Sequence, residues 1–195
     1  MPVYTEQELI IGCRKQIRQY QEQLYKQYYS MFLLVCARYA KDMQDAEQLL
    51  NDGFLKVYTH INSFKDKGSF EGWMRRIMVN TCLDYLRSNY LRDSLVMHVN
   101  ALPPTIAENS MAVNNSGLEQ IEFKELLKLV QELPVITRTV FNLFIFEGFN
   151  HKEIAAQLDI SEKTSHWHIH QARATLQKKL KKNELLNVRY EVKRI

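Results

Sequence analysis

The sequence predicts an all-α protein made of two small helical domains joined by a flexible linker. Apolar residues recur at spacings of three and four over most of the chain, which is the periodicity of amphipathic helices. Glycine and proline number only six and four among 195 residues, and no series of short alternating segments bounded by turn residues indicates strands. The periodicity fails between about residues 92 and 117, where Pro103-Pro104, four Asn, three Ser and Gly117 are typical of a linker.

A structureless stretch of that length is uncommon inside one compact domain, so we expect two domains. The first would span residues 1–91, the linker 92–117 and the second domain 118–195.

The first helical segment begins at Thr5, because Thr5 and Glu8 have the spacing of a capping box. Apolar residues continue at helical spacing to about Ala40. The pattern leaves open whether the helix is interrupted near Gly12.

A further helix follows Asp42, which is a good N-cap residue, and reaches about Ile61. Its first turn carries Asp45, which suits the helix dipole. The side opposite the apolar residues carries Gln48, Asn51 and Asp52, which by themselves would be an ordinary solvated face. Gly53 costs about 1 kcal/mol relative to alanine in a helix interior, so we expect another helix to cross closely there.

The third helix is expected over about residues 70–91, after a polar loop at residues 63–68 and with Ser69 as its N-cap. One stripe of this helix carries polar residues at positions i, i+4, i+8 and i+11, namely Arg76, Asn80, Asp84 and Arg87.

Aromatic and basic residues are interleaved around that loop. The aromatic residues are Phe64, Phe70 and Trp73, and the basic ones are Lys65, Lys67, Arg75, Arg76 and Arg87. Cations that neutralise phosphates and rings that stack on bases are what single-stranded nucleic acid requires. The alternative is that the rings belong to the core and the arginines form a solvated face, and the sequence leaves both interpretations open.

The second domain is predicted to contain helices over about residues 118–133 and 135–147, with Pro134 in the first turn of the latter and Gly148 after its end. We expect Val140, Phe141, Phe144 and Ile145 to be buried.

Residues 150–173 then have the pattern of a helix-turn-helix. Asn150 and Glu153 form a capping-box-like start, Asp159 tolerates the left-handed conformation of a tight turn, and Ser161 can cap the second helix.

That second helix has few apolar anchors, namely Ile169, Ala172 and Leu176. Its other side chains are mostly donors of the kind that contact DNA in the major groove: Lys163, Thr164, His166, Trp167, His168, His170 and Arg173. From Glu162 to the end of the chain, nine Lys and Arg stand against three Glu, so the basic excess lies on and behind this helix. A plain helical hairpin with a solvated second helix is the alternative.

Composition and motifs argue against an enzyme. The net charge of +4 permits a nucleic-acid partner without requiring one. The sequence contains no Gly-rich phosphate loop, no Gly-x-Ser-x-Gly and no His-Glu-x-x-His. His166, His168 and His170 are expected to be exposed and to need no metal, because no carboxylate or thiolate partner is nearby. Three scattered cysteines, no signal peptide and no long apolar run indicate a cytoplasmic protein.

Three segments in this order resemble the extracytoplasmic-function (ECF) sigma factors of the sigma-70 family of bacterial RNA polymerase. They are residues 45–58 (DAEQLLNDGFLKVY), residues 70–87 (FEGWMRRIMVNTCLDYLR), and residues 133–161 with the helix-turn-helix. The similarity extends over about residues 20–180.

The resemblance implies a promoter-specificity subunit that requires no cofactor and no small-molecule substrate. Its partners would be core RNA polymerase, promoter DNA and an anti-sigma factor. The residues implied to contact core polymerase are Asp45, Gln48, Asn51 and Asp52. Those implied to hold the melted −10 strand are Lys65, Lys67, Ser69, Trp73, Arg75, Arg76, Asn80, Asp84 and Arg87. Those implied to read the −35 duplex are Ser161, Lys163, Thr164, His166, Trp167, His168, His170 and Arg173.

Some positions differ from the family pattern. Asp159 stands where glycine is usual, Ser165 where many members have an apolar residue, and Gly53 where a larger residue is common. The histidines and Trp167 are unusual, so the −35 sequence preference cannot be transferred. A helix-turn-helix regulator that acts without polymerase is the alternative function, and the polar face of residues 45–52 argues against it because a sensor domain would not need it.

Overall fold

The computed structural model describes residues 4–96 and 126–192, and these two ranges contain helices and no strand. The chain divides into two units, Met1–Val113 and Asn114–Ile195. The predicted all-α class with two helical domains is thereby confirmed. In the described ranges, no helix has both the length and the apolar character that crossing a bilayer requires. Most of the predicted linker lies outside the described residues, so its boundaries stay predictions.

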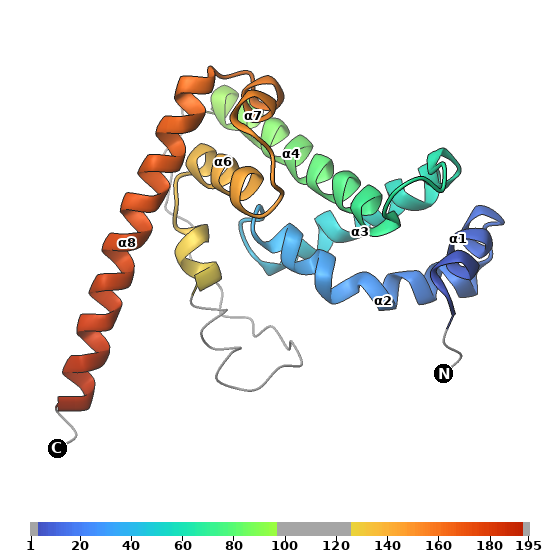
Figure 1. The fold of residues 1–195 in the computed structure, drawn as a ribbon, viewed down its shortest axis with the longest axis horizontal. Coiled ribbons are helices and arrows are strands. Elements are labelled where there is room, and N and C mark those ends of the chain that lie inside the picture. Colours follow the sequence, from blue (N-terminus) through green and yellow to red (C-terminus); the bar gives the residue numbers. More distant parts are fainter. Residues whose placement is uncertain (1–3, 97–125, 193–195) are drawn as a thin grey trace. The chain divides into compact units, whose positions relative to one another are not determined.

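The first unit contains α1 (Glu6–Arg14), α2 (Arg18–Ala37), α3 (Met43–His60), the short 3₁₀ helix η1 (Ile61–Ser63) and α4 (Phe70–Val96), as Figure 1 shows. Thr5 forms the predicted capping box with Glu8. The question left open near Gly12 is answered by a break at residues 15–17, where Gln16 has a φ of 56°. Gly12 itself lies inside α1, against the ring of Tyr20 on α2, and a Cβ there would lie 2.1 Å from Tyr20 Cγ.

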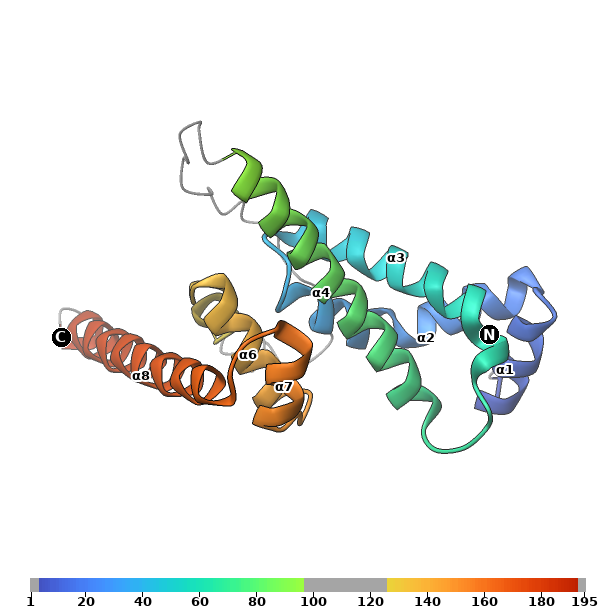
Figure 2. The same cartoon turned by 90° about the horizontal axis from the view of Figure 1, so that it is seen from above.

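α3 packs on both α2 and α4 (Figure 2). Its residues Leu50, Phe54 and Val57 are almost completely buried. Asp42 accepts a hydrogen bond from the N–H of Asp45 at 2.9 Å, as expected of an N-cap. The close crossing predicted at Gly53 is confirmed, because a Cβ at this position would lie 2.2 Å from the sulfur of buried Met78 on α4. The backbones of α3 and α4 can therefore approach closely beside the polar face of α3.

The second unit contains a helical segment described over residues 126–131, whose predicted start near residue 118 lies outside the described residues. It is followed by α6 (Val135–Ile145), α7 (His151–Leu158) and α8 (Glu162–Val192). α8 packs on both α6 and α7. The centre of this unit is formed by fully or nearly fully buried side chains, among them Val140, Leu143, Ile154, Ile169 and Ala172.

Three expectations about the helices were wrong. α4 does not end near residue 91 but continues to Val96, which is consistent with the absence of glycine and proline from residues 88–96. Pro134 is the N-cap of α6, with ψ of 141°, and not a residue of its first turn. Of the four residues expected to be buried on this helix, Ile145 is 43% exposed and Phe144 is half-buried, because α6 ends at Ile145.

Candidate functional sites

The polar face of α3 is exposed where the sequence predicted a polymerase contact. Gln48, Asn51 and Asp52 are exposed, whereas Asp45 is half-buried. Two of these residues are held by tyrosines of neighbouring helices. The Tyr25 hydroxyl of α2 donates to Asn51 Oδ1 at 2.8 Å, and the Tyr85 hydroxyl of α4 donates to Asp45 Oδ2 at 2.5 Å. The two side chains therefore have defined positions before any partner binds.

A groove of about 450 Å³ runs between α3 and α4 beside this face. From α3 it is lined by Asp45, Gln48, Leu49, Asp52, Leu55 and Lys56, and from α4 by Thr81, Asp84, Tyr85 and Ser88. Leu55 is 65% exposed and gives this wall of the groove an apolar surface. The groove thus has residues from the predicted polymerase-binding set on one wall and Asp84 of the predicted DNA-binding stripe on the other.

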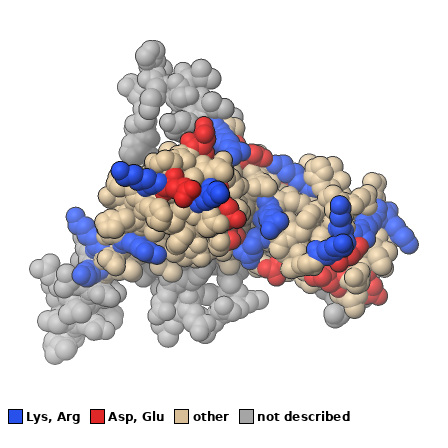
Figure 3. Space-filling model, turned by 45° about the horizontal axis from the view of Figure 1, so that its top comes forward, with Lys and Arg blue, Asp and Glu red and all other residues tan. Residues whose placement is uncertain are grey.

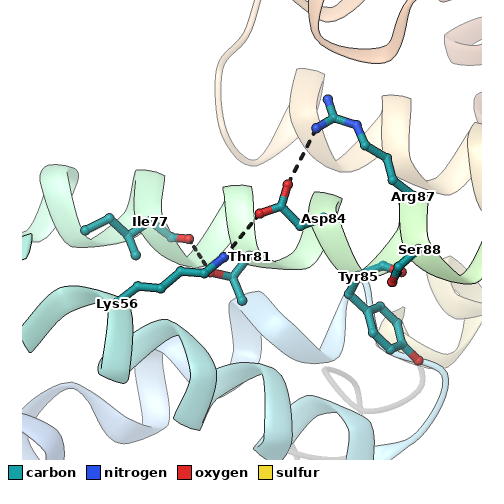
Figure 4. A network of polar contacts seen from close by, with 7 residues as sticks. All are labelled: Lys56, Ile77, Thr81, Asp84, Tyr85, Arg87 and Ser88. Atoms are coloured by element: carbon teal, nitrogen blue, oxygen red, sulfur yellow. Dashed lines mark hydrogen bonds and ion pairs between the residues drawn. The ribbon is translucent and has the colours of Figure 1, made fainter. Parts of the chain in front are cut away.

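Asp84 is the centre of a charge network in that groove (Figure 4). Its Oδ2 accepts a hydrogen bond from Lys56 Nζ of α3 at 3.1 Å, and its Oδ1 lies 3.5 Å from Arg87 Nη1 on α4. All three side chains are between 42% and 58% exposed, so each pair contributes at most about 1 kcal/mol to stability. The contact between Lys56 and Asp84 therefore orients side chains of α3 and α4 towards each other but adds little to stability.

The polar stripe of α4 is solvent-exposed as predicted, since Arg76, Asn80, Asp84 and Arg87 are all exposed. Arg75 differs from them because its guanidinium lies 3.7 Å from the sulfur of Met31 on α2 and 3.4 Å from the Glu71 carboxylate. Arg75 is therefore half-buried beside α2 and does not share the exposed stripe.

Two of the three aromatic residues near the loop belong to the core. Phe64 and Phe70 are 6% and 0% exposed, so the core interpretation is correct for them. Trp73 is half-buried, with its ring stacked on Phe70 at a centroid distance of 5.7 Å and an interplanar angle of 14°. Only Trp73 retains accessible ring surface for a base.

The loop itself exposes Lys65 and Lys67. Ser69 is engaged as a cap, because its Oγ accepts a hydrogen bond from the N–H of Gly72 at 3.1 Å. Sequence reasoning missed Arg14, whose guanidinium contacts this loop at Phe64 and Asp66. No local pattern could have revealed contacts across 50 and 52 residues of sequence.

The helix-turn-helix has the geometry that its sequence predicts. Asn150 forms a complete capping box with Glu153, and Asp159 has the left-handed conformation at φ 54° and ψ 48°. Ser161 Oγ accepts a hydrogen bond from the N–H of Thr164 at 3.0 Å, which caps α8. The three predicted anchors, Ile169, Ala172 and Leu176, are buried.

The N-terminal part of α8 presents only some of its predicted donors to solvent. Lys163, His166, Trp167, His170 and Arg173 are exposed, and Trp167 is 55% exposed. Thr164 is half-buried. The expectation of three exposed imidazoles was wrong for His168, which is half-buried with its Nδ1 3.0 Å from Thr137 Oγ1 of α6. Burial lowers the pKa of His168, which favours the neutral ring.

His151 of α7, which the sequence analysis did not single out, connects the two helices of the motif. Its ring lies between Phe144, at a centroid distance of 4.6 Å, and His166, at 3.5 Å. His151 Nδ1 also lies 2.9 Å from Oγ of Ser165, which is fully buried. Burial, and then the neighbouring His166, lower the pKa of His151. The unusual Ser165 therefore has a hydrogen-bond partner, and His166 contacts α7 as well as solvent.

The described residues contain no group of three or more His, Cys, Asp or Glu side chains that could hold a metal ion. Charged residues are mixed on the face shown in Figure 3, where lysine and arginine are interspersed with aspartate and glutamate.

Comparison with known proteins agrees with this architecture. Residues 24–91 match the family model of sigma-70 region 2, and residues 123–176 match that of sigma-70 region 4. The two family matches, on a two-domain helical fold, define a sigma-70-type transcription initiation factor. Proteins of this class do not catalyse a reaction themselves.

Relatives with similar sequences narrow the class. The chain is 25% identical to the RNA polymerase sigma-H factor of Pseudomonas aeruginosa over 188 residues, which cover 90% of this chain and 93% of that protein. It is 27% identical to the ECF RNA polymerase sigma factor SigM of Bacillus subtilis over 146 residues, covering 72% and 83% of the two chains. Among solved structures, the sigma factor RpoE of Bartonella quintana in complex with the anti-sigma factor NepR has a similar fold. The TM-score is 0.53 at 19% identity, covering 82% of this chain and 98% of that one.

The chain belongs to the extracytoplasmic-function branch of the sigma-70 family of RNA polymerase sigma factors. The predicted family is confirmed, and a regulator that acts without polymerase is not favoured.

Proposed function

We propose that this sigma factor contacts core RNA polymerase through α3, holds the melted −10 strand on α4 and loop 64–68, and reads the −35 duplex with α8. The observation that carries the proposal is the shared groove of α3 and α4. Gln48 and Asp52 of the predicted polymerase-binding surface and Asp84 of the predicted DNA-binding stripe all line this groove, whose volume is about 450 Å³.

The α3 surface suits a partner that supplies donors and cations. It presents the carboxylates of Asp45 and Asp52 and the amides of Gln48 and Asn51, together with exposed Leu55 as an apolar contact. Charged groups around an apolar centre favour a specific interface. The residues proposed to bind core polymerase differ from those proposed to bind DNA, so mutations can test the two activities separately.

The −10 strand would be held by exposed cations and one accessible ring. Arg76, Arg87 and the lysines of loop 64–68 suit phosphates, Asn80 suits a base edge, and Trp73 suits a stacked base. Arg75 and Ser69 contribute to this surface by supporting it, given that their side chains already contact protein groups.

The −35 duplex would be read by the first turns of α8. Lys163 and Arg173 suit phosphates or guanine, whereas Trp167 and His170 are exposed candidates for base contacts. His168 suits a supporting role through Thr137 of α6, and His166 is supported by its stack with His151.

The paired replacement Asn51→Ala and Asp52→Ala tests the polymerase contact. We expect weaker binding to sigma-free core polymerase, with unchanged helix content, because both side chains are exposed and outside the packed centre. Gln27→Ala, an exposed amide on α2, is the matched control. Unchanged core affinity in the double variant would show that the α3 assignment is wrong.

The −35 assignment is tested with Lys163→Ala and Arg173→Ala. Both replacements should reduce transcription from promoters that depend on the −35 element. An equal loss on templates with a scrambled −35 element would contradict base reading by α8 and leave only phosphate contact.

An anti-sigma factor is part of the proposal. The structurally similar RpoE was determined in complex with the anti-sigma factor NepR. A second similar structure is that of CnrH in complex with the cytosolic domain of CnrY. A partner of this class would cover the α3 surface or the α8 surface, and competition with core polymerase in a binding assay would detect it.

A further inference from the structure

Loop 64–68 has a backbone that requires support. Asp66 has a φ of 54°, in the left-handed region that aspartate tolerates better than most residues but that still costs free energy for any residue except glycine, and Gly68 has a φ of 84°. At its start the loop is fixed by the ring of Phe64, which packs on Phe70 and Trp73 at 5.1 and 5.6 Å. A non-glycine residue in this conformation persists where surrounding contacts hold it.

Arg14 supplies such a contact from the other side. Its Nη2 donates to the carbonyl oxygen of Phe64 at 2.5 Å and lies 3.0 Å from Oδ2 of Asp66. One guanidinium therefore bridges two points of the loop, two residues apart. Charge-assisted hydrogen bonds of this kind are stronger than neutral ones.

Arg14 is the last residue of α1, a helix held in place by its buried residues. The preceding residues Leu9, Ile10 and Cys13 are almost completely buried in the first unit. Burial also raises the pKa of the Cys13 thiol to about 11, so this part of α1 adds no charge near Arg14. α1 thus provides a rigid support from which Arg14 reaches the loop.

We propose that Arg14 is a positioning residue for capture of the melted −10 strand. It fixes the backbone that carries Lys65 and Lys67, so the loop does not have to be ordered when DNA binds. α1 precedes residues 24–91, which match region 2, so the family match assigns no role to Arg14. This inference rests on the proposed role of the loop in DNA binding.

The competing explanation is that Arg14 contacts a phosphate directly. The two explanations differ in salt dependence. Loss of one phosphate contact lowers the slope of log affinity against log salt by about 0.7 for a single strand, whereas loss of a positioning contact lowers affinity and leaves the slope unchanged.

The experiment uses the holoenzyme formed with core polymerase and a promoter fragment whose −10 region is already melted by mismatches. Arg14→Gln removes both loop contacts. Asp66→Asn removes only the ion pair, and asparagine also tolerates the left-handed conformation. Arg18→Gln, an exposed arginine at the start of α2, is the matched control for loss of one positive charge.

Arg14→Gln should weaken binding to the melted fragment about five-fold, with core affinity and salt slope as in the parent. Asp66→Asn should give a smaller loss, and the double variant should be no worse than Arg14→Gln, because both act through one contact. A loss no larger than that of Arg18→Gln, or a salt slope reduced by about 0.7, would overturn the proposal.

Lys65→Gln combined with Lys67→Gln separates this inference from the proposed function. If that variant binds the melted fragment normally, the loop is not a DNA surface and the proposed role of the loop in −10 binding fails. If it binds weakly while Arg14→Gln binds normally, only the positioning role is refuted. A folding defect would be recognised by reduced core affinity and a lowered Tm.

Discussion

Replacing Asp84 with asparagine should tighten binding to single-stranded −10 DNA and make it less selective. Asp84 places a negative charge in the middle of an exposed stripe that includes Arg76, Asn80 and Arg87. Its two oxygens are occupied by Lys56 at 3.1 Å and Arg87 at 3.5 Å. Asparagine has nearly the same shape and removes the charge, so the perturbation is electrostatic.

The structure sets the size of the effect. Both ion pairs are more than 40% exposed, so each contributes at most about 1 kcal/mol to stability. For a unit of this size, a loss of about 1 kcal/mol corresponds to a decrease in Tm of about 4–8 °C. If Lys56 then turns to a phosphate, the slope of log affinity against log salt should steepen by about 0.7.

The assay is a salt titration of holoenzyme binding to melted promoter fragments, for the parent and for Asp84→Asn. Glu22→Gln is the matched control, because Glu22 is an exposed carboxylate on α2 that pairs with Lys26 at 2.6 Å. The control should leave both affinity and slope unchanged. Weaker binding by Asp84→Asn at every salt concentration, with an unaltered slope, would refute the reasoning and identify Asp84 as a direct base contact.

Three further predictions concern other parts of the chain. The pKa of His151 and of His168 is lowered in the folded state, so as pH falls the unfolded state binds protons at a higher pH than the folded state does. The Tm of the second unit should therefore fall from pH 7.5 towards pH 5.5. A His151→Gln variant with undiminished pH dependence would contradict this prediction. Tyr25→Phe removes the hydrogen bond to Asn51 and should weaken core binding about five-fold. If Tyr25→Phe causes an equal loss of core affinity in a protein that already carries Asn51→Ala, the hydroxyl does not act through Asn51. Asp159→Val should destabilise the second unit by about 1–2 kcal/mol because φ is 54°, whereas Asp159→Gly should not; equal Tm values for the two variants would argue against the left-handed turn.

Local signals in the sequence were sufficient for most of the fold. The capping residues Thr5, Asp42, Asn150 and Ser161 all act as predicted, because a cap depends on residues only three positions away. Gly53 was informative for a similar reason, since a glycine inside a good helix indicates a close neighbour. The end of α4 was less predictable, because residues 88–96 have no strong stop signal.

The candidate sites were predictable as surfaces and not as contacts. Helical spacing correctly grouped Arg76, Asn80, Asp84 and Arg87 on one exposed stripe. It could not distinguish Arg75, because the Met31 sulfur that it contacts lies 44 residues away in sequence.

The same limit applies to His168 and His151, whose partners Thr137 and Ser165 come from other helices. Hydrogen bonds between distant residues depend on how helices pack, and periodicity within one helix contains no information about that.

Binding to sigma-free core RNA polymerase tests the central claim most directly. The chain would be mixed with core polymerase and a randomised DNA library, and bound DNA would be sequenced with and without polymerase. We predict a stable complex, and enrichment of fragments with two spaced elements only when polymerase is present. Failure to bind core polymerase, or equal enrichment by the chain alone, would contradict the account and favour a regulator that acts by itself.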